Sequence, residues 1–238
     1  MSDSLTHEFD RLSRQLCEKP SITGQVKHFL RELIIGGKLR SGERIVETVI
    51  ARQLGIGQPT VREALESLQD EGLVIRRPNR GCTVVELSGK EVEQIFRVRI
   101  EWEALAVKLA MENWSVEKSQ ELTRAIEALE SAARERNAEV YYRQDLEFHQ
   151  AIWRFADNPF LAKALSQVTV PLFAFVMVKV AAEQPFDFIS NAAEHRLLAD
   201  AILSGDSQQA VALARSALES FQMTGIEMLA DQAAAGKK

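Results

Sequence analysis

The chain has 238 residues, of which 26% are charged and 46% are hydrophobic, so it is long enough for one large domain or two small ones and too apolar for wholesale disorder. No uninterrupted apolar run approaches the roughly 18 residues of a membrane span, and residues 1–10 lack the basic start and apolar middle of a signal peptide. Two cysteines, Cys17 and Cys82, offer neither a disulfide framework nor a zinc pattern, so we expect a cytoplasmic protein without a membrane partner.

The formal net charge of −5 is divided unevenly along the chain. Residues 1–86 hold 13 Lys+Arg against 12 Asp+Glu, which is 13 − 12 = +1, and residues 87–238 hold 16 against 22, which is 16 − 22 = −6. Most glycines precede residue 90, so the first part is rich in turns and the second in long helices. We predict two domains, 1–86 and 87–238, with residues 1–20 as an N-terminal extension.

Three helices are predicted in the first domain. Apolar residues at three- and four-residue steps over 26–34 indicate an amphipathic helix that ends at the glycine pair 36–37. A short helix follows over 47–54, the segment Gly55-Ile56-Gly57 provides a sharp turn, and a further helix runs from near Gln58 to Gly72. Two short helices joined by a glycine turn are typical of a helix-turn-helix.

A β-hairpin is predicted after the third helix. The β-prone segments Leu73–Arg77 and Cys82–Leu87 flank Pro78-Asn79-Arg80-Gly81, which has the composition of a tight turn. Helix, helix, turn, helix and hairpin together describe a winged helix-turn-helix, and the arginines of the hairpin favour a wing that contacts DNA.

The start of the helix at Gln58 carries side chains suited to reading bases. Gln58 and Arg62 lie four residues apart on one face; glutamine pairs with adenine, and arginine binds guanine through two hydrogen bonds. The alternative for Arg62 is a surface ion pair with Glu66. The other residues expected to contact DNA, mainly at phosphate groups, are Thr60, Arg44, Arg52, Arg76, Arg77, Arg80 and Gly81.

The second domain is predicted to be an all-α bundle of six to seven helices. We place helices at about 90–113, 116–136, 139–156, 159–181, 190–204 and 207–233. Asp145 and His149 lie one turn apart, and His195 lies on a later helix whose apolar face points inward. One carboxylate and two imidazoles from two helices suit a divalent metal with open positions. The same three residues would also suit an iron-dependent enzyme, which stays open as an alternative.

The first domain resembles the DNA-binding domain of the GntR family of bacterial transcription regulators. The similarity lies in Gly37-Lys-Leu-Arg-Ser-Gly42, in Glu47, in Leu54-Gly-Ile-Gly-Gln-Pro-Thr-Val-Arg-Glu-Ala-Leu65, in Leu68-Gln-Asp-Glu-Gly-Leu-Val74 and in Arg80-Gly81. Members commonly have Ser-Arg where this chain has Gly57-Gln58, and acyl-responsive members often have arginine near Thr48. Arg62 and Gly81 are therefore the DNA contacts that the resemblance carries over most directly.

The second domain resembles the all-helical FCD type of effector domain of the FadR subgroup. The matching residues are Arg99 with Glu103, Asp145-x-x-Phe-His149, Asn158 and Glu194-His195. Metal-binding members use one aspartate and three histidines, so the resemblance implies zinc, nickel or manganese at Asp145, His149 and His195. Ala217 stands where the third histidine is expected.

The resemblance also implies an effector pocket beside these residues, involving Arg99, Glu103 and Asn158, for a small carboxylic acid. We expect Arg99 to bind the carboxylate; the alternative is an ion pair with Glu103 on a solvated helix face. The expected protein is a homodimeric repressor of a near-palindromic operator on double-stranded DNA. A second alternative keeps this fold but replaces the metal and the acid with a fatty acyl group.

Overall fold

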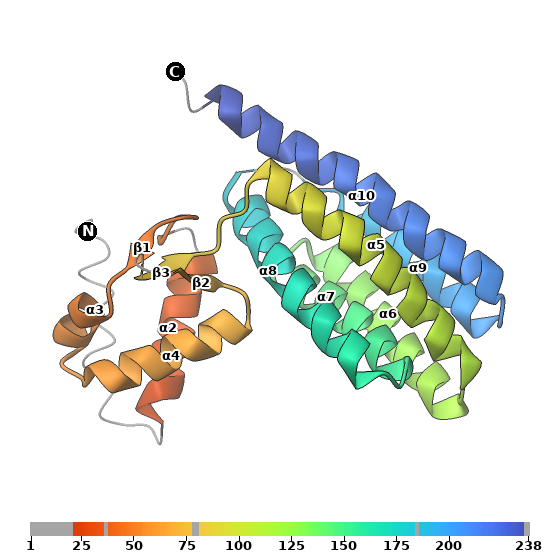
Figure 1. Cartoon of the computed structure of the whole chain (residues 1–238), viewed down its shortest axis with the longest axis horizontal. Coiled ribbons are helices and arrows are strands. Elements are labelled where there is room, and N and C mark those ends of the chain that lie inside the picture. Colours follow the sequence, from red (N-terminus) through yellow and green to blue (C-terminus); the bar gives the residue numbers. More distant parts are fainter. Residues whose placement is uncertain (1–20, 36–37, 78–80, 184–185, 236–238) are drawn as a thin grey trace. The chain divides into compact units, whose positions relative to one another are not determined.

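Figure 1 shows the chain as a computed structural model whose described residues are 21–35, 38–77, 81–183 and 186–235. The chain divides into two compact units, Met1–Glu86 and Leu87–Lys238. The first contains three described helices and a small sheet, and the second is helical throughout its described residues. The predicted fold class, a winged helix-turn-helix followed by an all-helical bundle, is confirmed.

The helices of the first unit pack through the apolar positions that predicted them. Helix α2 spans Ile22–Ile35, α3 spans Glu47–Leu54 and α4 spans Gln58–Asp70. Gly55 ends α3 in the left-handed conformation at φ 66°, which glycine adopts without a steric penalty. The core that joins the helices consists of Val26, Leu30, Leu33, Ile34, Ile50, Leu54, Val61, Leu65 and Leu68.

The sheet of the first unit has three antiparallel strands in the order β1-β3-β2. Strand β2 (Val74–Arg77) and strand β3 (Gly81–Val84) form the predicted hairpin. Strand β1 (Arg44–Ile45) was not predicted; it pairs Arg44 with Thr83 and Ile45 with Cys82. Two residues are too short for a periodic pattern, so only the pairing partner reveals this strand.

Six helices make up the described part of the second unit. Their bounds are α5 Gly89–Glu112, α6 Val116–Glu135, α7 Ala138–Phe155, α8 Pro159–Glu183, α9 Phe188–Leu203 and α10 Ser207–Ala235. Side chains cap the starts of the first three of these helices: Ser88 forms a capping box with Glu91, and Ser115 and Asn137 accept hydrogen bonds from the first turns of α6 and α7.

Helix α5 lies at the centre of the contacts in this unit. It packs along α10, as Figure 1 shows, and it also contacts α7 and α8, while α6 contacts α7 and α9. Polar residues of α5, α7 and α9 line one cavity in this unit.

Helix α8 is long and apolar enough over Pro159–Val178 to cross a membrane by length and composition, although Lys163 and Pro171 interrupt its apolar run. More than half of that stretch is buried in the unit, including Leu165, Leu172 and Phe173. The core helix of a soluble bundle passes the same test, and contact with α5 and α7 accounts for the apolar composition of α8.

Candidate functional site

The carboxylate of Glu47, at the first position of α3, joins three of the residues predicted to contact DNA. Gln58 Nε2 donates to Glu47 Oε2 at 3.1 Å, and Arg62 Nε donates to the same oxygen at 3.3 Å. Arg76 Nη2, from β2, donates to Glu47 Oε1 at 3.0 Å. These four residues are called the Glu47 cluster below.

Charge and hydrogen bonding keep Glu47 ionised. Partial burial alone would raise its pKa, but the hydrogen bonds from Gln58 and Arg62 and the charges of Arg62 and Arg76 lower it below the ordinary value. The ion pair of Arg62 is thus with Glu47 in another helix rather than with Glu66 of its own helix, and Glu66 lies 3.9 Å from Arg76.

The other residues predicted to contact DNA from the sheet lie apart from the Glu47 cluster. The exposed side chain of Arg44 lies over Gly81, because a β-carbon at position 81 would be 3.7 Å from the Arg44 guanidinium. Gly81 has φ 76°, a left-handed conformation that favours glycine. Arg80 lies outside the described residues, and Arg77 is described only as the last residue of β2.

The remaining two DNA-binding candidates lie near the helix-turn-helix. Thr60 is half-buried in the first turn of α4, where its backbone N–H donates to Gly57. Arg52 is exposed in the last turn of α3. Neither belongs to the Glu47 cluster.

A buried polar network occupies the interior of the second unit. Arg99 Nε donates to Glu103 Oε1 at 3.0 Å, and both side chains are only 3% exposed. The second oxygen of Glu103 lies 3.2 Å from His149 Nδ1 and accepts a hydrogen bond from Trp153 Nε1 at 2.8 Å. The Arg99–Glu103 ion pair, predicted from the sequence as the alternative to carboxylate binding by Arg99, therefore exists, but it is buried rather than on a solvated face.

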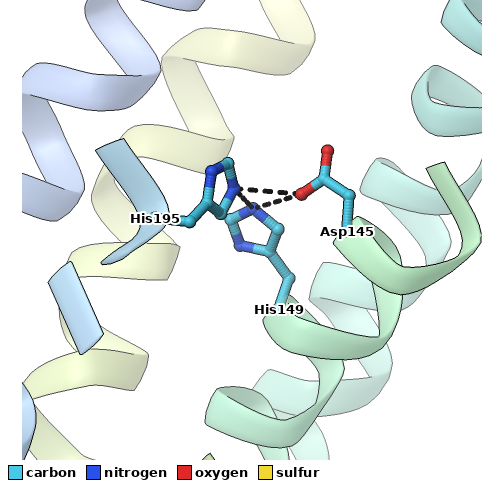
Figure 2. Close-up of side chains that lie close together, drawn as sticks. All are labelled: Asp145, His149 and His195. Carbon is cyan, nitrogen blue, oxygen red and sulfur yellow. Dashed lines mark hydrogen bonds and ion pairs between the residues drawn. The ribbon is translucent and has the colours of Figure 1, made fainter. Parts of the chain in front are cut away.

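Asp145 and His149 of α7 meet His195 of α9 beside this network (Figure 2). Asp145 Oδ1 lies 3.0 Å from His195 Nε2 and 3.5 Å from His149 Nε2, and the two Nε2 atoms are 3.3 Å apart. Three ligand atoms around one tetrahedral metal with bonds near 2.05 Å are separated by about 3.3 Å. The observed separations fit such an ion.

Contacts at the Nδ1 atoms orient both histidine rings. His195 Nδ1 lies 2.8 Å from the carbonyl oxygen of Asn191, and His149 Nδ1 faces Glu103, so the Nε2 atom of each ring points toward Asp145. This is the arrangement in which histidine ligands are usually held. Arg99 Nη2 also lies 3.1 Å from His149 Nε2, so a metal and the guanidinium would compete for this nitrogen.

The ionisation of the carboxylates follows from these contacts. Burial alone would raise the pKa of Glu103, but His149, Arg99 and Trp153 hold it at about 2. Burial likewise opposes ionisation of Asp145, yet the charge of His195 lowers the pKa of Asp145. In turn Asp145 raises the pKa of His195 despite the burial of that ring.

A cavity adjoins the network and the Asp145–His149–His195 group. Arg99, Glu103 and the three candidate metal ligands all line it, and Ala217 of α10 lines it where the sequence analysis expects a further histidine. Asn158 has a different place: its Oδ1 accepts a hydrogen bond from the Leu161 N–H and caps the start of α8. We therefore leave Asn158 out of the effector site proposed below.

Two residues of these sites are not predicted by the sequence. Glu47 has partners 11 to 29 residues away, and no periodicity connects it with them. Tyr142 shares a helix face with Asp145 and His149 at steps of three and four. That spacing was the signal that could have identified it.

Comparison with known proteins identifies both units. Residues 22–84 match the family described as bacterial regulatory proteins, gntR family, and residues 94–220 match the FCD domain. The HTH-type transcriptional regulator YdhC of Bacillus subtilis is 30% identical over 140 residues, which are 58% of this chain and 62% of that protein.

Two further similar proteins cover more of the chain. The "Probable D-xylose utilization operon transcriptional repressor" of Paenarthrobacter nicotinovorans is 29% identical over 84% of this chain and 87% of that protein. The solved structure of Escherichia coli McbR/YncC has a TM-score of 0.67 at 27% identity and covers 90% of this chain and 100% of that chain.

These families and relatives are transcription regulators, so the iron-dependent enzyme considered from the sequence is set aside. The winged helix-turn-helix implies DNA binding, and the FCD domain implies a small-molecule effector. The chain therefore belongs to the GntR family of bacterial transcription regulators, with an FCD domain as its second unit.

Proposed function

We propose that this regulator is a repressor whose binding to DNA is controlled by a small carboxylic acid in the cavity of the FCD unit. The observation that carries the proposal is the guanidinium of Arg99, which lines that cavity beside Asp145, His149 and His195. Two of its N–H groups contact Glu103 and His149, and a guanidinium has five, so further donors can bind a carboxylate.

The Glu47 cluster supports α4 as the helix that reads bases. Gln58 and Arg62 project from its first turns, and Arg76 of β2 joins them at the same carboxylate. Glutamine and arginine at the start of a recognition helix bind adenine and guanine edges in the major groove. Thr60, Arg52 and Arg44 are proposed to contact phosphate, and Gly81 lets the wing backbone approach DNA closely.

We further propose a homodimer that binds two half-sites of a near-palindrome. One α4 reads one half-site, and dimeric helix-turn-helix proteins commonly bind half-sites about one helical turn apart. The effector changes the spacing of the two reading helices, and switching follows if it binds the DNA-competent and DNA-incompetent arrangements with different affinities.

Selection of DNA from a random duplex library, followed by fluorescence anisotropy at fixed salt, tests this function. We expect an enriched near-palindrome and release of that duplex by at least one organic acid from a panel that also contains fatty acyl chains. Binding without sequence preference would contradict the operator assignment. Release by acyl chains alone would favour the fatty-acyl alternative.

Asp145, His149 and His195 are proposed to hold a divalent ion, with zinc, nickel and manganese as candidates. Their separations of 3.0 to 3.5 Å suit one ion, and three protein ligands leave positions open on it. When bound, the ion would offer those positions to an effector carboxylate. The alanine at position 217 makes the ligand set one histidine smaller than that of metal-binding relatives.

Calorimetry on chelator-treated protein should show one site per chain at micromolar metal. His195→Ala is expected to abolish this binding, because two ligands remain. Ala217→His is expected to tighten it, since it restores a fourth ligand on the cavity wall. No heat of binding for the wild-type protein with any of the three metals would disprove the metal site.

Glu47→Gln is expected to raise affinity for scrambled DNA about two- to threefold and to lower the ratio of operator to scrambled affinity. The substitution removes a negative charge that opposes phosphate, and it loosens Gln58, Arg62 and Arg76. Glu63→Gln is the matched control, because Glu63 lies on α4 and accepts a hydrogen bond from Thr23 instead. Equal changes of DNA affinity in both variants would show that Glu47 acts only through the overall charge of the unit.

A further inference from the structure

Tyr142 lines the cavity, and its hydroxyl group is buried without a hydrogen-bond partner among the described residues. The side chain is 3% exposed, so bulk water does not provide a hydrogen bond to the hydroxyl group. The neighbouring Tyr141 differs: its hydroxyl donates to Asn191 Oδ1 at 2.7 Å. Buried hydroxyl groups are nearly always satisfied in proteins, so an orphaned one on a cavity wall requires an explanation.

Aromatic contacts hold the ring of Tyr142. The ring of Tyr142 packs against Tyr141, Phe186 and Phe188 at centroid distances of 5.7, 5.8 and 6.3 Å. On α7, Tyr142 precedes Asp145 by three residues and His149 by seven, so all three lie on one helix face and line the same cavity. Tyr142 thus lines the same cavity as Arg99, the residue proposed to bind the carboxylate.

The rest of the cavity wall limits the chemistry of the ligand. Apolar side chains from four helices form most of it, among them Val107, Leu172, Val176, Leu198, Leu218 and Phe221, and Asn191 and Glu194 of α9 are the remaining polar lining residues. A polyhydroxylated acid would leave without partners those of its hydroxyl groups that face the apolar side chains, which is costly. One additional oxygen on an otherwise apolar skeleton suits the wall.

We propose that Tyr142 is a specificity-determining residue that donates a hydrogen bond to a single hydroxyl or keto oxygen on the effector acid. The proposal rests on the proposed function, in which the cavity binds an organic acid through Arg99. The effector class becomes short acids that carry one such oxygen on an apolar skeleton. A site that hydrogen-bonds this oxygen discriminates against the analogue that lacks it, because the tyrosine hydroxyl would then stay buried and unpaired.

Thermal unfolding without any acid tests the orphaned hydroxyl directly. Tyr142→Phe removes only the oxygen and is expected to keep or raise the melting temperature, because no hydrogen bond is lost. Tyr141→Phe is the matched control and is expected to lower it, because the bond to Asn191 is lost. A drop for Tyr142→Phe as large as that for Tyr141→Phe would overturn the proposal, since the hydroxyl would then have a structural partner.

Calorimetry with pairs of acids that differ by one hydroxyl tests specificity. The pairs are propionate and lactate, succinate and malate, and phenylacetate and mandelate. Gluconate is tested beside them as a polyhydroxylated acid. For a pair that binds, we expect the wild-type protein to prefer the hydroxy acid by about tenfold, and we expect Tyr142→Phe to lose this preference while it still binds the parent acid. Tyr141→Phe should retain the preference.

The outcomes separate the two levels of the proposal. An unchanged preference in Tyr142→Phe, or tighter binding of gluconate than of every monohydroxy acid, would overturn the role of Tyr142 and leave the effector site standing. If the wild-type protein bound none of these acids at millimolar concentration, the proposed effector class would be contradicted. The proposed role of Tyr142 in recognising that class would then be contradicted as well.

Discussion

Arg62→Ala is expected to weaken binding to the selected operator by about 1 to 3 kcal/mol, or roughly 5- to 150-fold, and to change binding to scrambled duplex much less. Arg62 lies in the second turn of α4, is exposed, and is placed by Glu47 next to Gln58. An arginine at such a position gains two hydrogen bonds from guanine that a nonspecific sequence does not offer. Anisotropy titrations of both duplexes at several salt concentrations measure the difference.

Arg31→Ala is the control for lost charge. Arg31 lies on α2 and forms an ion pair with Glu71, outside the Glu47 cluster. We expect this variant to weaken binding to both duplexes by the same small factor, because it alters only the overall charge. If Arg62→Ala also reduced both affinities equally, Arg62 would be a phosphate contact and α4 would not be reading guanine through it.

Arg99→Ala is expected to lower the free energy of unfolding of the FCD unit by about 3 to 5 kcal/mol. The substitution leaves the carboxylate of Glu103 buried without its guanidinium partner and removes a contact to His149. All three tryptophans of the chain lie beyond residue 86, so tryptophan fluorescence in urea follows the unfolding of this unit. The same variant should lose the response to the effector acid.

Arg97→Ala provides the matched control on the same helix. Arg97 also pairs with a glutamate four residues away, Glu93, but its side chain is 73% exposed. Exposed pairs of this kind contribute at most about 0.5 kcal/mol, so the variant should unfold close to the wild-type midpoint. Similar losses in the two variants would show that burial of the Arg99–Glu103 pair carries no special energetic weight.

The sequence predicted most of the fold because local signals mark the ends of the elements. Gly55 adopts the left-handed conformation that the turn requires, and Ser88, Ser115 and Asn137 cap helices where the apolar pattern begins. Strand β1 escaped prediction because its evidence is a pairing with residues about 40 positions further along the chain.

The candidate site was predictable where its residues share an element. Asp145 and His149 follow helical spacing, and the apolar face of α9 indicated that His195 points inward. Whether Arg99 is buried or solvated could not be decided from α5 alone, since the answer depends on α7 and α8. The Glu47 cluster was out of reach for the same reason: its members come from three elements.

The Glu47 cluster also bears on how quickly such a regulator can search a chromosome. One carboxylate offsets part of the charge of two arginines, Arg62 of α4 and Arg76 of β2, in a unit whose formal charge is only +1. Nonspecific DNA binding is almost entirely electrostatic, so a muted positive charge shortens each stay at a wrong sequence. Because wrong sequences outnumber the operator by about a million or more, short stays leave more molecules free to find it.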